Sequence, residues 1–152
     1  MRTLKIVCVG KIKEKYFNEG INLYGKQIRR LVPLEILECP DEPTPERASA
    51  AQEDAIRLKE GRRILQKIQR DDHVIALCID GKEYSSSAWA SHMKKVMNNL
   101  PGSLVFVIGG SLGLSDEVIQ RADEKLSFSS MTFPHQMMRM ILCEQIAKAL
   151  KI

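Results

Sequence analysis

The chain has 152 residues, of which 44% are hydrophobic and 28% charged, with a formal net charge of +4. This length and composition predict a single domain over residues 1–152 with its own hydrophobic core, and they argue against intrinsic disorder. The first apolar run, residues 4–9, is interrupted by Lys5, is too short to span a membrane and lacks a signal-peptide cleavage site, so we expect a soluble cytoplasmic protein.

Apolar runs of strand length alternate with helical patterns along the whole chain. This alternation predicts an α/β fold with a mainly parallel sheet that helices cover on both faces. The predicted strands are residues 4–9, 34–39, 73–79, 104–108 and 125–130. The predicted helices are residues 14–31, 45 to about 69, 85–98, a short one from 115 and a long one that opens at Pro134.

Local signals set several of the predicted boundaries. Thr44 is the expected N-cap of the second helix, with Pro45 as its first residue. Asp80-Gly81 is a turn pair that we expect to close the third strand. Ser115 is expected to cap the short helix with its own hydroxyl.

Residues 1–30 contain eight Lys and Arg against two Glu, a net +6, which leaves about −2 for the other 122 residues. This basic segment includes Lys11, Lys13, Lys15, Arg29 and Arg30. Such a charge distribution suits a nucleic-acid backbone, although charge alone fits a solvated helix face better. The four cysteines show no CxxC spacing and the histidines do not cluster, so we expect neither a metal site nor a disulfide.

The segment Gly109-Gly110-Ser111-Leu112-Gly113 leaves the fourth predicted strand. A dinucleotide-binding loop would have GxGxxG after the first strand, and a Walker loop would continue with Gly-Lys-Ser/Thr. Neither pattern is present, so an adenosine-containing ligand without a pyrophosphate fits better than NAD or ATP. A plain strand-to-helix turn explains the loop equally well.

Phe133-Pro134-His135-Gln136 opens the last helix, and Arg139 lies one turn beyond His135. A histidine near a helix N-terminus has a lowered pKa, because the helix dipole disfavours the imidazolium, and it could accept a proton or orient a substrate. The alternative is a capping or buried, hydrogen-bonded histidine. Met137, Met138 and Met140 fit a core or a dimer interface better than a chemical role.

Several of these segments occur together and in order. They are Val7-Cys8-Val9-Gly10-Lys11, Pro40-Asp41-Glu42, the strand before Asp80-Gly81-Lys82, Phe106-Val107-Ile108-Gly109-Gly110, and Leu126-Ser127-Phe128 through Phe133-Pro134-His135-Gln136. In this combination the chain resembles, over nearly its whole length, the bacterial 23S ribosomal RNA pseudouridine N3-methyltransferase family of the SPOUT class.

The resemblance implies a C-terminal trefoil knot, a homodimer, and S-adenosylmethionine bound in the knot loops. The implied cofactor contacts are Leu77, Gly109, Phe128, Ser129, Ser130, Met131, Thr132 and Phe133. The implied substrate is N3 of a pseudouridine in large-subunit ribosomal RNA, in the helix 69 hairpin that touches the decoding region of assembled ribosomes. His135 is then the candidate base or orienting group, with Arg139 stabilising negative charge on the uracil carbonyls.

Family members usually continue beyond the final helix with a tail ending near Tyr-His-Lys, whereas this sequence stops at Lys151-Ile152. If that tail binds RNA or handles the N3 proton, we expect the chain to bind cofactor and methylate poorly. Two alternatives stand beside the methyltransferase. The first, which the missing tail favours, is a non-catalytic RNA-binding or ribosome-assembly module on the same scaffold. The second is a small oxidoreductase that binds NAD or flavin, against which the glycine spacing counts.

Overall fold

The computed structural model describes residues 3–151. Its elements are β1 (Leu4–Val9), α1 (Lys15–Arg29), β2 (Leu34–Cys39), α2 (Ala50–Leu65), β3 (His73–Glu83), α3 (Ser86–Asn98), β4 (Leu104–Ile108), α4 (Asp116–Arg121), β5 (Glu124–Ser127) and α5 (His135–Leu150). The strands form one parallel sheet in the order β2-β1-β4-β3-β5. The predicted α/β class with a parallel sheet is confirmed.

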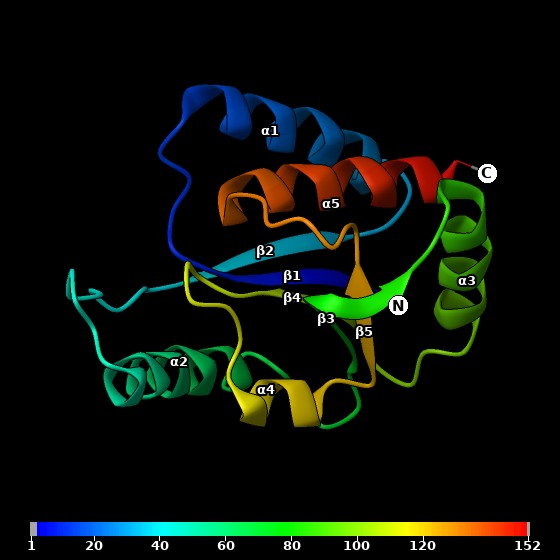
Figure 1. The fold of residues 1–152 in the computed structure, drawn as a ribbon. Coiled ribbons are helices and arrows are strands. Elements are labelled where there is room, and N and C mark those ends of the chain that lie inside the picture. Colours follow the sequence, from blue (N-terminus) through cyan, green and yellow to red (C-terminus); the bar gives the residue numbers. More distant parts are fainter. Residues whose placement is uncertain (1–2, 152) are drawn as a thin grey trace.

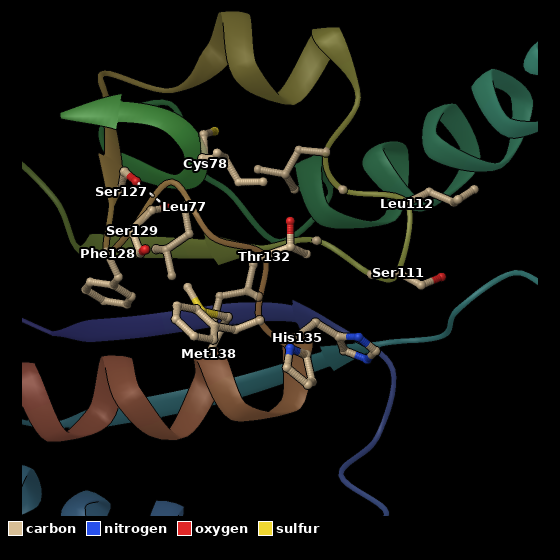
Figure 2. Close-up of a pocket in the computed structure, with 18 of the residues that line it drawn as sticks. Leu77, Cys78, Ser111, Leu112, Ser127, Phe128, Ser129, Thr132, His135 and Met138 are labelled. Atoms are coloured by element: carbon tan, nitrogen blue, oxygen red, sulfur yellow. Dashed lines mark hydrogen bonds between the residues drawn. The ribbon is translucent and has the colours of Figure 1, made fainter. Parts of the chain in front are cut away.

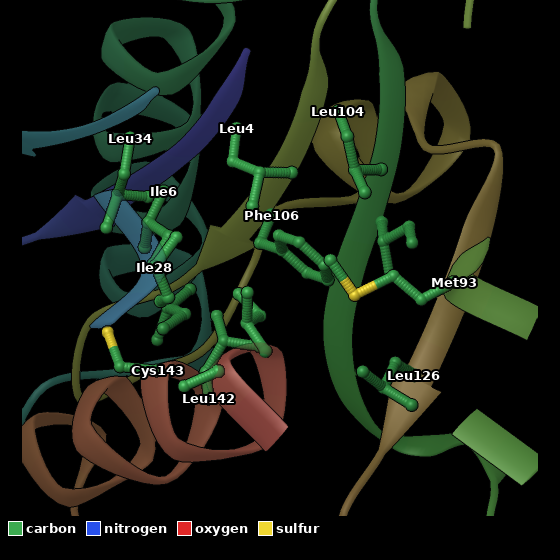
Figure 3. Packing of buried hydrophobic residues seen from close by; sticks show 14 of the residues in the cluster. Leu4, Ile6, Ile28, Leu34, Met93, Leu104, Phe106, Leu126, Leu142 and Cys143 are labelled. Carbon is green, nitrogen blue, oxygen red and sulfur yellow. The ribbon is translucent and has the colours of Figure 1, made fainter. Parts of the chain in front are cut away.

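Helices cover both faces of this sheet (Figure 1). α1 and α5 lie on one face, with α3 packed against α5, and α2 and α4 lie on the other. Because side chains alternate along a strand, Leu4, Ile6 and Cys8 of β1 enter the cluster under α1, α3 and α5, whereas Val7 and Val9 enter the cluster under α2 and α4. Phe106 of β4 is fully buried near the middle of the first cluster (Figure 3).

Two boundaries in the first half of the chain differ from the prediction. α2 begins after Ser49 and not at Pro45, because Ser49 and Gln52 form a reciprocal capping box. That Ser-x-x-Gln signal is readable in the sequence, but the prolines before it also fit a helix start. α1 ends at Arg29 and not at Leu31, which is 55% exposed. Within α1 the buried aromatic residue is Phe17, whereas Tyr16 is 62% exposed.

The third strand is longer than predicted. Leu77 and Lys82 of β3 both lie opposite Leu126 of β5, so the four residues between them bulge out and pairing then resumes. Asp80-Gly81 therefore interrupts the register without ending the strand. Gly81 is needed there, because a Cβ would lie 2.7 to 2.8 Å from the backbone of β5. β5 itself ends at Ser127, earlier than predicted.

Ser115 caps α4 as predicted, whereas Ser85, predicted as the first residue of its helix, is instead the N-cap of α3. Ser85 accepts a hydrogen bond from the amide of Ala88, and Ser115 accepts one from Val118. The trefoil knot implied by the resemblance stays a prediction. Within residues 3–151, no helix is long and apolar enough to cross a membrane, and the four cysteines are free thiols.

Candidate active site

A cavity of about 500 Å³ opens where β3 bulges and where β4 and β5 end (Figure 2). Ligands bind at the carboxyl ends of strands in open parallel sheets, and this volume is typical of a small-molecule site. Residues 77–79, 108–114, 127–129 and 131–135, together with Met138, line the cavity. Among these described residues, His135 and Cys78 carry the titratable side chains.

The glycine loop, defined as residues 109–114, forms one wall of the cavity. It folds back on itself, because the amide of Gly113 donates to the Gly110 carbonyl at 3.1 Å and Gly113 has a φ of +83°. A Cβ on Gly109 would lie 2.7 Å from the carbonyl carbon of Gly113. Glycine at position 109 is therefore required by the close approach of two backbone segments.

Hydrogen bonds also shape the loop between β5 and α5. The hydroxyl of Ser127 donates to the Ser129 carbonyl at 3.0 Å, and the hydroxyl of Ser129 accepts from the amide of Met131 at 3.0 Å. These contacts curve residues 127–131 around the cavity. Met131, at the edge of the cavity, is 70% exposed, so its apolar side chain is accessible to a molecule that binds from solvent.

His135 is the first residue of α5 and is partly buried between the cavity and the loop that follows β1. Its Nε2 lies 3.9 Å from the position that a Cβ on Gly10 would occupy. Burial lowers the pKa of His135, the positive charges of Arg139 and Lys13 lower it further, and the carboxylate of Asp41 opposes them. A neutral imidazole facing the cavity can accept a proton.

Arg139 is only 2% exposed and is committed to other partners. One guanidinium nitrogen pairs with the Glu38 carboxylate at 2.6 Å, and another donates to the Gly10 carbonyl at 3.0 Å. One helical turn earlier, the side chain of Gln136 accepts from the amide of Lys13 at 2.9 Å. The start of α5 thus holds the loop after β1 at two points.

The structure brings most of the predicted site residues to one cavity. Its lining includes His135 and seven of the eight predicted cofactor contacts, namely Leu77, Gly109, Phe128, Ser129, Met131, Thr132 and Phe133. Ser130 is exposed and is not part of the lining, and Arg139 lies outside it beside Glu38.

Sequence reasoning missed several lining residues. Met138 faces the cavity from the second turn of α5, whereas its setting in the sequence indicated a core or a dimer interface. Cys78, Ile79, Ser127 and Pro134 also line it. Each is adjacent in sequence to a predicted contact or to another lining residue of the same segment. Extending the predicted contacts by one or two residues along the same loops would have included them.

The basic residues of the N-terminal segment do not form one patch. Lys11 and Lys13 lie in the loop before α1 and Lys15 is its first residue, whereas Arg29 and Arg30 lie at its other end. Of the three lysines, Lys13 acts on the charge of His135. All five are exposed. A helix of this length separates the two groups by about 20 Å.

Comparisons with known proteins agree with this architecture. The sequence model of a family described as predicted SPOUT methyltransferase matches residues 1–152. Proteins named ribosomal RNA large subunit methyltransferase H are similar over 149 residues, or 98% of this chain and 94% of theirs. The one from Clostridioides difficile is 53% identical and the one from Lactiplantibacillus plantarum 48% identical.

A solved structure, a probable methyltransferase from Bordetella pertussis, shares the fold. Its TM-score is 0.58 at 12% sequence identity, and the alignment covers 97% of this chain and 93% of that one.

The charges around His135 generate a first prediction. We expect its imidazole to titrate below the ordinary histidine pKa, because burial and Arg139 disfavour the imidazolium. Asp41→Asn should lower the pKa further and Lys13→Gln should raise it, since these substitutions remove charges of opposite sign. Histidine resonances followed by NMR as a function of pH measure all three values.

The lowered pKa of His135 also makes the stability of the folded protein depend on pH. Because the unfolded chain takes up the proton first, the contribution of His135 to stability is present above the unfolded-state pKa and is lost as pH falls from there through the folded-state pKa. A midpoint at or above the ordinary value, or shifts of the same sign in the two variants, would contradict this account.

Proposed function

The chain belongs to the SPOUT methyltransferase family, and we propose that it methylates N3 of a pseudouridine in 23S ribosomal RNA with S-adenosylmethionine as the methyl donor. Family membership supports methyl transfer, and the names of the similar proteins support large-subunit ribosomal RNA as the substrate. The observation that carries the proposal is the cavity bounded by the glycine loop and His135.

The residues around this cavity suit S-adenosylmethionine. Leu77, Phe128 and Phe133 offer apolar surface for an adenine ring, and the glycine loop and residues 129–132 offer backbone groups for the ribose and the amino-acid portion. We include Ser130 in this set through its backbone, since its neighbours on both sides line the cavity. When bound, the cofactor supplies an electrophilic methyl group on its sulfonium.

His135 is the group that we propose to accept or orient the N3 proton. It faces the cavity and its lowered pKa keeps it neutral near pH 7, so it can act as an acceptor. Arg139 was predicted to stabilise negative charge on the uracil carbonyls. Its commitment to Glu38 and Gly10 favours a positioning role, in which it holds the loop after β1 against His135.

The substrate would reach the cavity from the side of Met131 and the loop after β1. Lys11, Lys13 and Lys15 are exposed in the loop after β1 and at the start of α1 and would contact RNA phosphates there, whereas Arg29 and Arg30 would contact a more distant part of the RNA. The pseudouridine of the helix 69 hairpin in the assembled ribosome is the proposed target. A ribosomal target implies a cytoplasmic protein, and the resemblance implies that it acts as a homodimer.

Cofactor binding is the first test. We expect S-adenosylhomocysteine, the demethylated product, to bind saturably in calorimetric titration. Gly109→Ala should abolish or strongly weaken binding, because the added Cβ would displace the backbone at Gly113. Gly25→Ala in α1 is the matched control, since its Cβ would meet mainly the flexible end of Arg29.

The outcomes separate the candidate functions. If the folded wild-type protein does not bind S-adenosylhomocysteine, the methyltransferase proposal fails and the non-catalytic RNA-binding module becomes the better account. Preferential binding of NAD or flavin would instead favour the oxidoreductase.

Methyl transfer tests the role of His135. With saturating cofactor and ribosomes, His135→Ala should lower the single-turnover rate by about a hundredfold or more, because it removes the proposed proton acceptor. Transfer of radiolabelled methyl to 23S RNA, followed by nucleoside analysis for N3-methylpseudouridine, measures the rate and the product. A full rate in this variant would remove His135 from the mechanism.

The same assay separates a positioning role of Arg139 from loss of folding. Arg139→Gln removes a positive charge near His135, so the acidic limb of the pH–rate profile should move to higher pH. A lower rate with an unmoved profile would mean that Arg139 acts only on stability.

RNA binding should depend on salt through the basic residues. We expect the affinity for a helix 69 hairpin to fall steeply with salt concentration. In a plot of the logarithm of the association constant against the logarithm of salt concentration, the slope should become shallower by about one for each phosphate that the lysines no longer neutralise. Fluorescence anisotropy of the Lys11→Gln/Lys13→Gln/Lys15→Gln variant measures this change. An unchanged slope would show that these lysines do not contact phosphates.

A further inference from the structure

The glycine loop is supported from outside the cavity by α2. Ser111 and Gly113 are exposed at the tip of the loop, and the short helix α4 follows it. From the contacts between α2 and this loop we infer that Arg57 is the positioning residue that fixes the glycine loop in its binding conformation. The inference rests on the proposed function of the cavity as the cofactor site.

Arg57 makes one direct contact with the loop. Its Nε–H donates to the carbonyl of Leu112 at 2.9 Å, and Leu112 lines the cavity. A second guanidinium nitrogen pairs with Asp54 of the same helix at 2.6 Å, which orients the side chain. Only 27% of the Arg57 side chain is exposed, so solvent competes weakly for the hydrogen bond.

Two further residues of α2 meet the same segment. Glu60 is buried, and its Oε1 lies 3.2 Å from the position that a Cβ on Gly110 would occupy. Gly61 packs so closely on Ser115, the N-cap of α4, that a Cβ there would collide with the serine hydroxyl. Positions 57, 60 and 61 lie on one helix face, so a single face of α2 supports the loop from Gly110 to Ser115.

The same helix holds the loop that precedes it. The other carboxylate oxygen of Glu60 accepts from the amide of Glu42 at 2.9 Å, and Arg63 donates to the Pro40 carbonyl at 2.9 Å and pairs with Glu42. Asp41, between these anchored residues, is close enough to influence His135. α2 is thus a common support for the glycine loop and for the segment beside the proposed catalytic histidine.

Arg57 differs from Glu60 and Gly61 because it reaches the exposed part of the loop. Without its hydrogen bond, residues 111–113 would depend on the turn that Gly110 and Gly113 form. A ligand would then have to order the loop on binding, and its affinity would fall by that ordering cost.

The test compares Arg57→Ala with two matched variants. Arg62→Ala makes the same substitution on the same helix, at a residue that reaches Glu117 of α4 and not the loop. Asp54→Asn removes the ion-pair partner of Arg57 but leaves its Nε–H free to donate. We expect the dissociation constant of S-adenosylhomocysteine to rise about tenfold in Arg57→Ala, as for the loss of one charged hydrogen bond, and about twofold or less in the other two.

Two further measurements exclude a general loss of structure. In methyl transfer assays, Arg57→Ala should raise the KM for S-adenosylmethionine with little change in kcat, since Arg57 does not touch the reacting atoms. Amide hydrogen exchange of the ligand-free protein should accelerate at residues 111–114 in Arg57→Ala but not in Arg62→Ala. This measurement requires no ligand.

The outcomes are distinguishable. Unchanged exchange and affinity in Arg57→Ala overturn the inference, and so does an equal loss in Arg62→Ala, which would indicate general damage to the α2–α4 packing. Failure of the wild-type protein to bind S-adenosylhomocysteine defeats the proposed function, while the exchange measurement still decides whether Arg57 holds the loop.

Discussion

The buried guanidinium of Arg139 is the interaction on which the arrangement around His135 depends. A charged group this deeply buried is costly unless it is paired, and Arg139 pairs with Glu38 at the end of β2 and with the carbonyl of Gly10 after β1. The pair therefore joins α5 to the ends of two neighbouring strands. His135 lies one turn earlier on α5, and the contacts of Arg139 with Glu38 and Gly10 hold it beside Gly10.

Close backbone approach is the second constraint, and it explains how a small sheet can enclose a cavity. Gly81 allows β5 to pass against the bulge of β3, and Gly109 allows the glycine loop to fold back on itself. Both glycines lie at the carboxyl end of the sheet, where the cavity opens. The apolar lining comes from strand ends and loops, and the helices position it from outside.

Local sequence signals predicted much of this architecture. The limits of β1, β2 and β4 and the serine cap of α4 follow from apolar runs and a hydroxyl residue, and the structure confirms them. The predicted start of α2 was wrong because two possible N-caps, Thr44 and Ser49, lie five residues apart. Only the reciprocal hydrogen bonds of Ser49 and Gln52 decide between them.

Contacts between distant segments could not be read from the sequence. Nothing near Asp80-Gly81 indicates that β3 resumes its pairing, because the partner residues belong to β5. Arg139 has the helical spacing expected of a residue on the same face as His135. Its partners Glu38 and Gly10, however, lie about a hundred residues or more away along the chain, and their contacts hold its side chain outside the cavity. The polar face of α2 likewise has the sequence of a solvated surface, and only the position of the glycine loop against it gives Arg57 a partner.

The order of strands in the sheet has a consequence for how the chain folds. β1 lies between β2 and β4, and Leu4 of β1 is opposite Leu104 of β4. β1 can pair with β2 soon after both have been synthesised, but its other edge stays open until residue 104 has emerged from the ribosome. Closing a loop of that length precedes any gain from the central pairing, which slows folding relative to a protein of local contacts. The cavity is completed later still, because β5 and α5 are the last elements to be made.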